Sequence, residues 1–177
     1  MKKTILLLII VIIFASVPVF ASTLQVGVLG TVPVNITSFD MSTLDTITNL
    51  NKYYFGFESR LNLPLFQINT SIFRVDTLEK FRFGYIGAGF KIGIIEAGIS
   101  VPYAFSTENF IEDLKATVNH ETNFRIGVNA DFNFLSFILS YYIPTGIAFN
   151  RLIPDIVNIK PDVSKGGLGI SLMLNLL

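Results

Sequence analysis

Seven charged residues share a pattern that could do chemistry. Each lies in a segment where apolar and polar residues alternate, and each falls on the polar side: Glu58, Arg60, Arg82, Lys91, Glu96, Arg125 and Asp131. Three carboxylates and four cations on one face of a closed sheet would form either a hydrogen-bonded ion network or the lining of a narrow, gated ion path. An unpaired buried charge is costly, and eight strands rarely enclose a continuous channel, so we favour the network.

The single histidine, His120, invites a catalytic interpretation because Glu121 and Thr122 follow it. A histidine, an acid and a hydroxyl are the groups with which hydrolases activate a nucleophile. Consecutive strand residues point to opposite faces, however, so His120 and Glu121 would not share a site. Using Ser106 or Thr122 as the nucleophile would need an arrangement that the spacing does not indicate. We therefore predict no catalytic residues and keep a hydrolase only as an alternative.

Motifs for cofactors and metals are missing from the sequence. There is no phosphate-binding glycine loop, no dinucleotide motif between a strand and a helix, and no cluster with metal-ligand spacing. The absence of cysteine excludes disulfides and cysteine-based metal or redox sites. Several glycines follow the strand pattern, and we interpret them as spacers on the inner face: Gly84, Gly87, Gly89, Gly93 and Gly98. We predict neither a cofactor nor a metal.

The alternation returns along most of the chain and predicts β-strands. Eight such runs cover residues 24–28, 53–63, 66–72, 86–92, 96–103, 124–132, 135–141 and 168–176. Short connections fall near Pro64, 94–95 and 131–133, and they alternate with long ones at 32–51, 74–80, 104–121 and 144–165. An up-and-down barrel has this rhythm, with all short turns at one end. The sequence thus predicts an all-β fold, a closed barrel of eight antiparallel strands.

Local patterns add two expectations. Phe81, Phe83 and Tyr85 are out of phase with Ile86 onward, which predicts a bulge near Tyr85 or a strand that extends above the main sheet. Within 104–121, a pair resembling a helix cap, Asn109 and Glu112, predicts a short helix with one apolar side. The three prolines of 144–165 predict an irregular loop.

The two faces of the predicted strands differ in a way that indicates their solvent. One face is rich in Gly, Ser, Asn and Gln, and the other is rich in Phe, Ile, Leu and Val. On a soluble protein, water would favour Lys, Glu and Thr on the polar face, since glycine weakens a strand and packs nothing. Small polar groups fit the interior of a narrow barrel whose apolar face meets lipid. The alternative is a soluble secreted barrel that binds an apolar ligand.

Composition and the first residues agree with export to a membrane. Charged residues make up only 15% of the chain, with 13 basic and 13 acidic residues, so no basic field would attract nucleic acid. Lys2 and Lys3 precede an apolar run at 5–15, and Val19-Phe20-Ala21 resembles a cleavage site. We interpret 1–21 as a signal peptide cleaved after Ala21, and 22–177 as the barrel domain. An uncleaved anchor is the alternative, although its run is short of the ~20 residues a spanning helix needs.

The predicted barrel resembles the small eight-stranded outer-membrane β-barrels of Gram-negative-type bacteria, the class that includes OmpX and the membrane domain of OmpA. The resemblance covers nearly all of 22–177 and rests on architecture. Members of that class commonly end in an aromatic residue, whereas this chain ends in Leu176 and Leu177. The resemblance implies an outer-membrane location, contact with outer-membrane lipid and dependence on the outer-membrane assembly machinery.

The function expected from these observations is non-enzymatic. We expect a structural, envelope-integrity or surface-interaction role, with a partner contacted through the loops at 32–51, 104–121 and 144–165. The alternatives are a narrow gated channel through the lumen, a lipid A-modifying enzyme and the soluble barrel.

Overall fold

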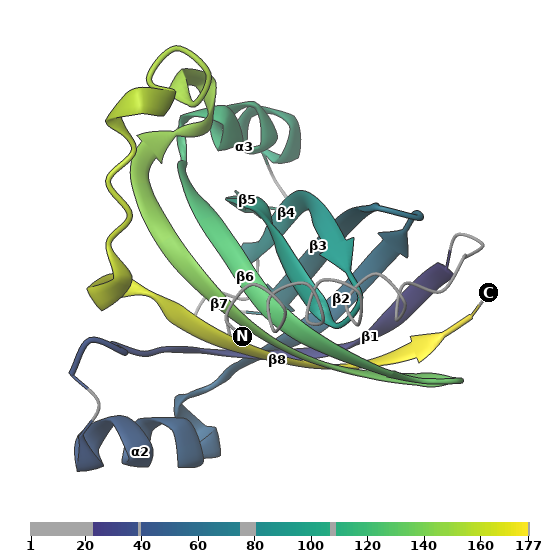
Figure 1. Cartoon of the computed structure of the whole chain (residues 1–177). Coiled ribbons are helices and arrows are strands. Elements are labelled where there is room, and N and C mark those ends of the chain that lie inside the picture. Colours follow the sequence, from purple (N-terminus) through teal and green to yellow (C-terminus); the bar gives the residue numbers. More distant parts are fainter. Residues whose placement is uncertain (1–22, 39, 75–80, 107–108, 177) are drawn as a thin grey trace, which may run out of the picture.

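A closed β-barrel forms the body of the molecule (Figure 1). The computed structural model describes residues 23–38, 40–74, 81–106 and 109–176, so the predicted signal peptide 1–21 with Ala21 lies outside the described residues. The strands are β1 (Thr23–Pro33), β2 (Tyr54–Asn62), β3 (Phe66–Arg74), β4 (Phe81–Ile92), β5 (Ile95–Ser106), β6 (Glu121–Phe132), β7 (Leu135–Ala148) and β8 (Gly167–Asn175). Each pairs antiparallel with the next, and β8 pairs with β1. The predicted closed barrel of eight antiparallel strands is confirmed.

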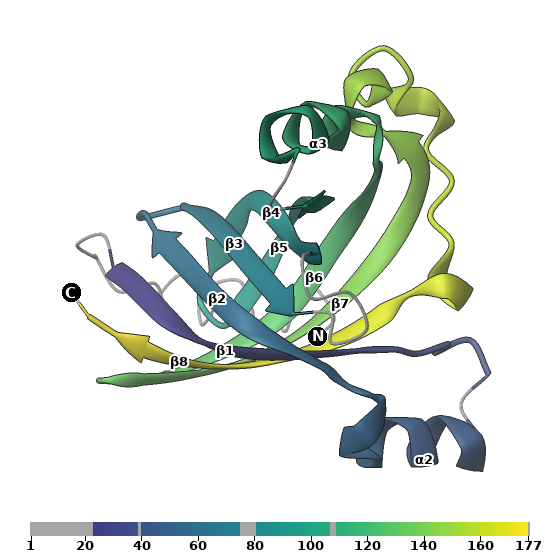
Figure 2. The same cartoon turned by 180° about the vertical axis from the view of Figure 1, so that it is seen from behind.

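The short connections and the described long ones lie at opposite ends of the barrel, as the sequence predicted. The predicted long connection 74–80 lies outside the described residues except for Arg74. Three turns at 63–65, 93–94 and 133–134 join strands at one end, the turn end. The start of β1 and the end of β8 lie beside them (Figure 2). Gly93 and Asn133 have positive φ angles of 59° and 39°, which these tight turns require. The described parts of the long segment 34–53, the segment 149–166 and the helix α3 (Phe110–Ala116) lie at the opposite end, the loop end.

The loops contain one predicted helix and one that the sequence did not predict. Helix α3 confirms the short helix expected within 104–121. Helix α2 (Met41–Thr48) begins after Asp40, whose Oδ1 accepts a hydrogen bond from the Thr43 N–H at 2.9 Å. Hydrogen bonds from the Ser42 hydroxyl and the Thr43 N–H hold the pKa of the Asp40 carboxyl below its usual range. The described part of 149–166 forms only short 3-10 turns, as its prolines predicted.

Strand β7 runs past the proline at which the sequence predicted a loop. It continues through Pro144 to Ala148, and its register with β6 shifts near Thr122. Gly146 there has a φ of 75°. The Thr145 hydroxyl donates to the Thr122 carbonyl at 2.9 Å, and the two threonine hydroxyls lie 2.7 Å apart. A bulge held by side-chain hydrogen bonds therefore replaces the regular ladder that Pro144 cannot complete.

Of the two alternatives predicted near Tyr85, the bulge is absent, whereas the strand does extend before Ile86, since β4 begins at Phe81. Tyr85 lies opposite Ser71 of β3 and Pro102 of β5 in regular register. Phe83 and Tyr85 point into the lumen, where they stack on Phe73 and Tyr142. The apparent change of phase arises because the inner face becomes aromatic toward the loop end while the strand continues unchanged.

Gly84 therefore points outward, and this position allows a close contact across β4. The Tyr103 hydroxyl donates to the Ser71 carbonyl of β3 at 2.6 Å. A Cβ atom on Gly84 would lie 1.8 Å from that carbonyl oxygen and 2.7 Å from the Tyr103 hydroxyl. Only glycine fits there without a shift of the backbone.

We expect Gly84→Ala to lower the free energy of unfolding by about 1–3 kcal/mol, because overpacking forces the strands to move. The measurement is urea unfolding of the purified, folded barrel, followed by circular dichroism. Gly167→Ala is the matched control, since a Cβ on Gly167 would be 3.5 Å from its nearest neighbour, the Val32 carbonyl oxygen. An equal effect of both substitutions would contradict the role of this contact.

The barrel has an apolar outer face and a polar inner face. Outward residues Val28, Ile86, Ile126 and Leu172 are each 50% exposed. Inward side chains are buried and mostly polar: Gln25, Glu58, Arg60, Asn62, Gln67, Asn69, Ser71, Glu96, Ser100, Arg125, Asn129, Ser136, Ser140 and Ser171. Soluble proteins bury their apolar residues, so this distribution is inverted.

Candidate functional site

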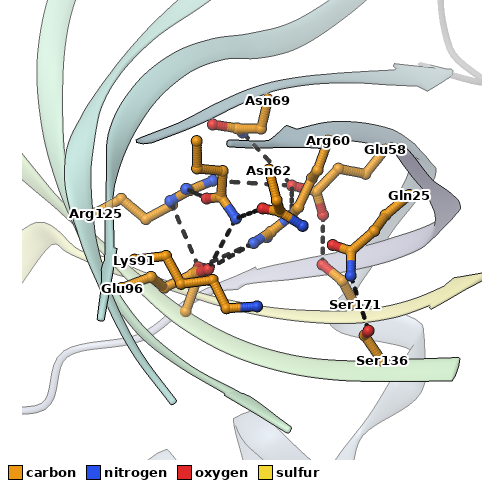
Figure 3. Close-up of polar contacts among 12 residues, drawn as sticks. Gln25, Glu58, Arg60, Asn62, Asn69, Lys91, Glu96, Arg125, Ser136 and Ser171 are labelled. Carbon is orange, nitrogen blue, oxygen red and sulfur yellow. Dashed lines mark hydrogen bonds and ion pairs between the residues drawn. The ribbon is translucent and has the colours of Figure 1, made fainter. Parts of the chain in front are cut away.

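Charged side chains from three strands meet inside the barrel (Figure 3). β2 supplies Glu58 and Arg60, β5 supplies Glu96, and β6 supplies Arg125. Arg60 Nε donates to Glu58 Oε1 at 2.8 Å, and Arg60 Nη1 lies 2.8 Å and 3.0 Å from the two Glu96 oxygens. Arg60 therefore joins carboxylates from strands on different sides of the lumen.

Arg125 approaches the same two carboxylates. Its Nη1 lies 3.9 Å from Glu58 Oε1, and its Nε lies 3.7 Å from Glu96 Oε1. Its Nη2 donates to Gln67 Oε1. Two guanidinium groups thus face two carboxylates, and the formal charges of the four side chains cancel.

Neutral side chains complete the hydrogen bonding of the carboxylates. Ser171 donates to Glu58 Oε2 at 2.6 Å, and Ser140 donates to Glu96 Oε1 at 3.1 Å. Gln67 Nε2 donates to Asn62 Oδ1 at 2.8 Å. We call this set the lumen network: Glu58, Arg60, Asn62, Gln67, Asn69, Glu96, Arg125, Ser140 and Ser171. Strand alternation places each member on the inner face. The members come from six of the eight strands, so the network links those strands across the lumen.

Glycines on the inner face leave room for these long side chains. A Cβ on Gly87 of β4 would lie 2.7 Å from the Asn69 Oδ1 atom. Gly89 and Gly98 also belong to the inner face, as the sequence predicted. The same interpretation was wrong for Gly84, which points outward, and for Gly93, which lies in a turn.

The four charged residues of the lumen network are out of reach of solvent. Each is no more than 2% exposed. Buried charges of this kind are tolerated when they are paired and hydrogen-bonded. Both carboxylates and the Nε and Nη1 atoms of Arg60 are bonded here, whereas Arg60 Nη2 and Arg125 Nη1 have no hydrogen-bond partner among the described residues. A water-filled path through the network would expose these four side chains to solvent. The arrangement can therefore hold the strands together and close the lumen.

An aromatic layer covers the lumen network on its loop-end side. Tyr85 and Tyr142 stack with ring centroids 5.1 Å apart, and Phe73 stacks on Phe83 at 4.8 Å. A small cavity of about 190 Å³ lies on the loop-end side of this layer, with Tyr54 and Lys165 in its lining. The layer separates that cavity from the buried charges.

A second polar group closes the turn end of the lumen. Lys91 pairs with Asp131, and Ser136 donates to Asp131. Gln25 Nε2 donates to Ser136 Oγ at 2.8 Å and to Asn175 Oδ1 at 2.7 Å. The Asp131 side chain is 42% exposed, so this group meets solvent.

The seven charges predicted to form one network are thus divided. Glu58, Arg60, Glu96 and Arg125 meet in the lumen, whereas Lys91 and Asp131 pair separately at the turn end. Arg82 belongs to β4, but its side chain lies outside the described residues. Sequence reasoning missed the neutral members and the aromatic layer. The signal was present in the polar alternation, because every neutral member lies on the polar side of its predicted strand.

His120, Glu121 and Thr122 contact separate partners in the described structure. His120 Nδ1 lies 2.7 Å from the Pro102 carbonyl oxygen, and Glu121 Oε1 accepts a hydrogen bond from the Gly146 N–H at 2.6 Å. The Thr122 hydroxyl is buried against Thr145. The side chain of Ser106 lies outside the described residues. Each of the three consecutive residues thus binds a different partner in the neighbouring strands.

Comparison with known proteins adds no family. No protein-family model matches the chain, and no curated protein is significantly similar to it. Among the described residues, no helix is long and apolar enough to cross a membrane, and no group of three His, Cys, Asp or Glu side chains could hold a metal ion. Function must be inferred from the two faces of the barrel and the contents of its lumen.

Proposed function

We propose that the chain is a non-enzymatic outer-membrane β-barrel protein with a closed lumen, acting in envelope structure or surface interaction through its loops. The observation that carries this proposal is the inverted polarity of the barrel. Half-exposed aliphatic side chains cover the outside, and hydrogen-bonded charges fill the inside. Lipid favours an apolar outer surface of this kind. Closure of the barrel leaves no unpaired strand edge within the membrane.

The same polarity argues against the soluble alternative. A secreted barrel that binds an apolar ligand needs an apolar cavity within. The lumen here contains the lumen network and the aromatic layer instead. The partners we propose for this chain are outer-membrane lipid and the outer-membrane assembly machinery.

The loop end supports a surface role. Segments 109–120 and 149–158 are joined, since the Phe149 N–H donates to the His120 carbonyl at 3.1 Å and Asn150 Nδ2 donates to Asn119 Oδ1 at 2.8 Å. Apolar side chains project from the joined segments: Phe110, Ile111, Val118, Phe149, Ile153, Ile156 and Val157. Exposed apolar groups on a scaffold of this kind are typical of contact surfaces.

Cell fractionation tests the location. We expect the protein in the outer-membrane fraction after an alkaline wash, and we expect its gel migration to change on heating because a folded barrel resists detergent. Recovery from the periplasm or the medium without detergent would contradict the proposal. Stepwise current in planar bilayers would favour the channel instead, and lipid A deacylation abolished by His120→Ala would favour the enzyme.

A further inference from the structure

Two hydroxyl groups interrupt the apolar outer face at one place. Ser59 of β2 and Thr70 of β3 point outward and lie directly opposite each other in the register. Val26 pairs with Ser59 on one side, and Ile86 pairs with Thr70 on the other. In the sequence these residues are two separate gaps in the apolar alternation, and the fold brings the gaps together.

The hydroxyl pair lies in the middle of the barrel wall. Ser59 is between Glu58 and Arg60 of the lumen network, so it shares their level. The next outward positions on these strands are apolar in both directions, with Phe57 toward the loop end and Leu61 toward the turn end. Neither hydroxyl makes a hydrogen bond to another described residue. Lipid tails offer no acceptor, so a hydroxyl at this depth gains from a protein partner.

A groove and a projecting side chain accompany the pair. The groove encloses about 510 Å³ on the outer wall, and its lining includes Val26, Ser59, Thr70, Ile72 and Leu174. Phe57 stands at its edge and, at 70% exposure, is the most exposed large apolar side chain of the described strands. One surface thus carries both a knob and a hole.

We propose that the outer wall of β2 and β3 binds the same wall of a second copy of this chain within the membrane. This inference rests on the proposed membrane location. A two-fold contact requires a self-complementary surface. Hydroxyls are both donors and acceptors, so the pair Ser59–Thr70 can bind its own copy, and each Phe57 can enter the facing groove. The outward lining residues carry no charge that would select a different partner.

Cysteine crosslinking tests the contact, because the natural chain has no cysteine. We expect Thr70→Cys to form disulfide-linked dimers on oxidation in intact membranes. The matched control is Ile126→Cys, an outward position on β6 at the opposite wall that is 50% exposed, and we expect it to stay monomeric. Equal crosslinking of both variants, no crosslinking of Thr70→Cys, or crosslinking only to other proteins would overturn the inference.

Removal of the hydroxyls gives a second measurement. The variant Ser59→Ala with Thr70→Val keeps similar shapes, and we expect it to raise the dimer dissociation constant about 3- to 20-fold, as measured by energy transfer between labelled chains diluted in lipid vesicles. An unchanged constant would overturn the inference. Heat-modifiable migration separates the two proposals. A membrane-inserted monomer contradicts only the dimer, whereas a protein that never enters the membrane contradicts both.

Discussion

Replacing Arg60 with alanine is expected to lower the free energy of unfolding by about 3–5 kcal/mol, because it leaves buried carboxylates without their main partner. Arg60 bonds to Glu58 and to both oxygens of Glu96, and its side chain is fully buried. Urea unfolding of the barrel in vesicles would measure the loss. Lys52→Ala is the control, since the exposed pair Lys52–Asp45 should contribute under 1 kcal/mol.

The same substitution should also change conductance. Without Arg60, the charged centre has two carboxylates and one guanidinium, so any current that appears in planar bilayers should favour cations. Glu96→Ala leaves the opposite imbalance, and its current should favour anions. A silent wild type with selectivity of opposite sign in these two variants would identify the lumen network as the plug. Unchanged stability and conductance in Arg60→Ala would contradict any role for it.

An arginine in place of Ile126 is expected to lower the free energy of unfolding in a bilayer by about 2–4 kcal/mol, the range for a cation at mid-bilayer. Ile126 is half exposed on the outer face of β6, with no charged residue beside it on that face. On a soluble barrel the same change would add a wetted surface charge and have little effect.

Ile153→Arg provides the comparison for this variant. Ile153 is 85% exposed in the loop that follows β7, so an arginine there should leave stability within about 0.5 kcal/mol of the wild type. Unfolding in vesicles of defined lipid would compare the two. Similar small effects at both positions would mean that the outer face meets water.

Strand alternation was enough to predict most of the fold. Residues such as Ile126, Val128 and Arg125 have a fixed side once the chain is extended, and the lengths of the connections set the order of the strands. The lumen location of Glu58, Arg60, Glu96 and Arg125 follows from the same parity. These features depend on local geometry, which the sequence records directly.

The errors have a different physical origin. Helix α2 depends on the cap at Asp40, a weak local signal. The path of β7 beyond Pro144 depends on hydroxyl bonds between Thr122 and Thr145, which are distant in sequence. The separation of Lys91 and Asp131 from the other charges depends on height along the barrel axis, and that height follows from the strand register, which periodicity does not define.

The pairing of β1 with β8 has a consequence for biogenesis. Gln25 lies opposite Asn175, so the first strand to leave the ribosome must wait for the last before the wall is complete. Until then the chain has two unpaired strand edges and an apolar outer surface, which together favour aggregation. Loss of the last strand would therefore leave a nascent protein dependent on chaperones throughout its life, however well its other strands pair.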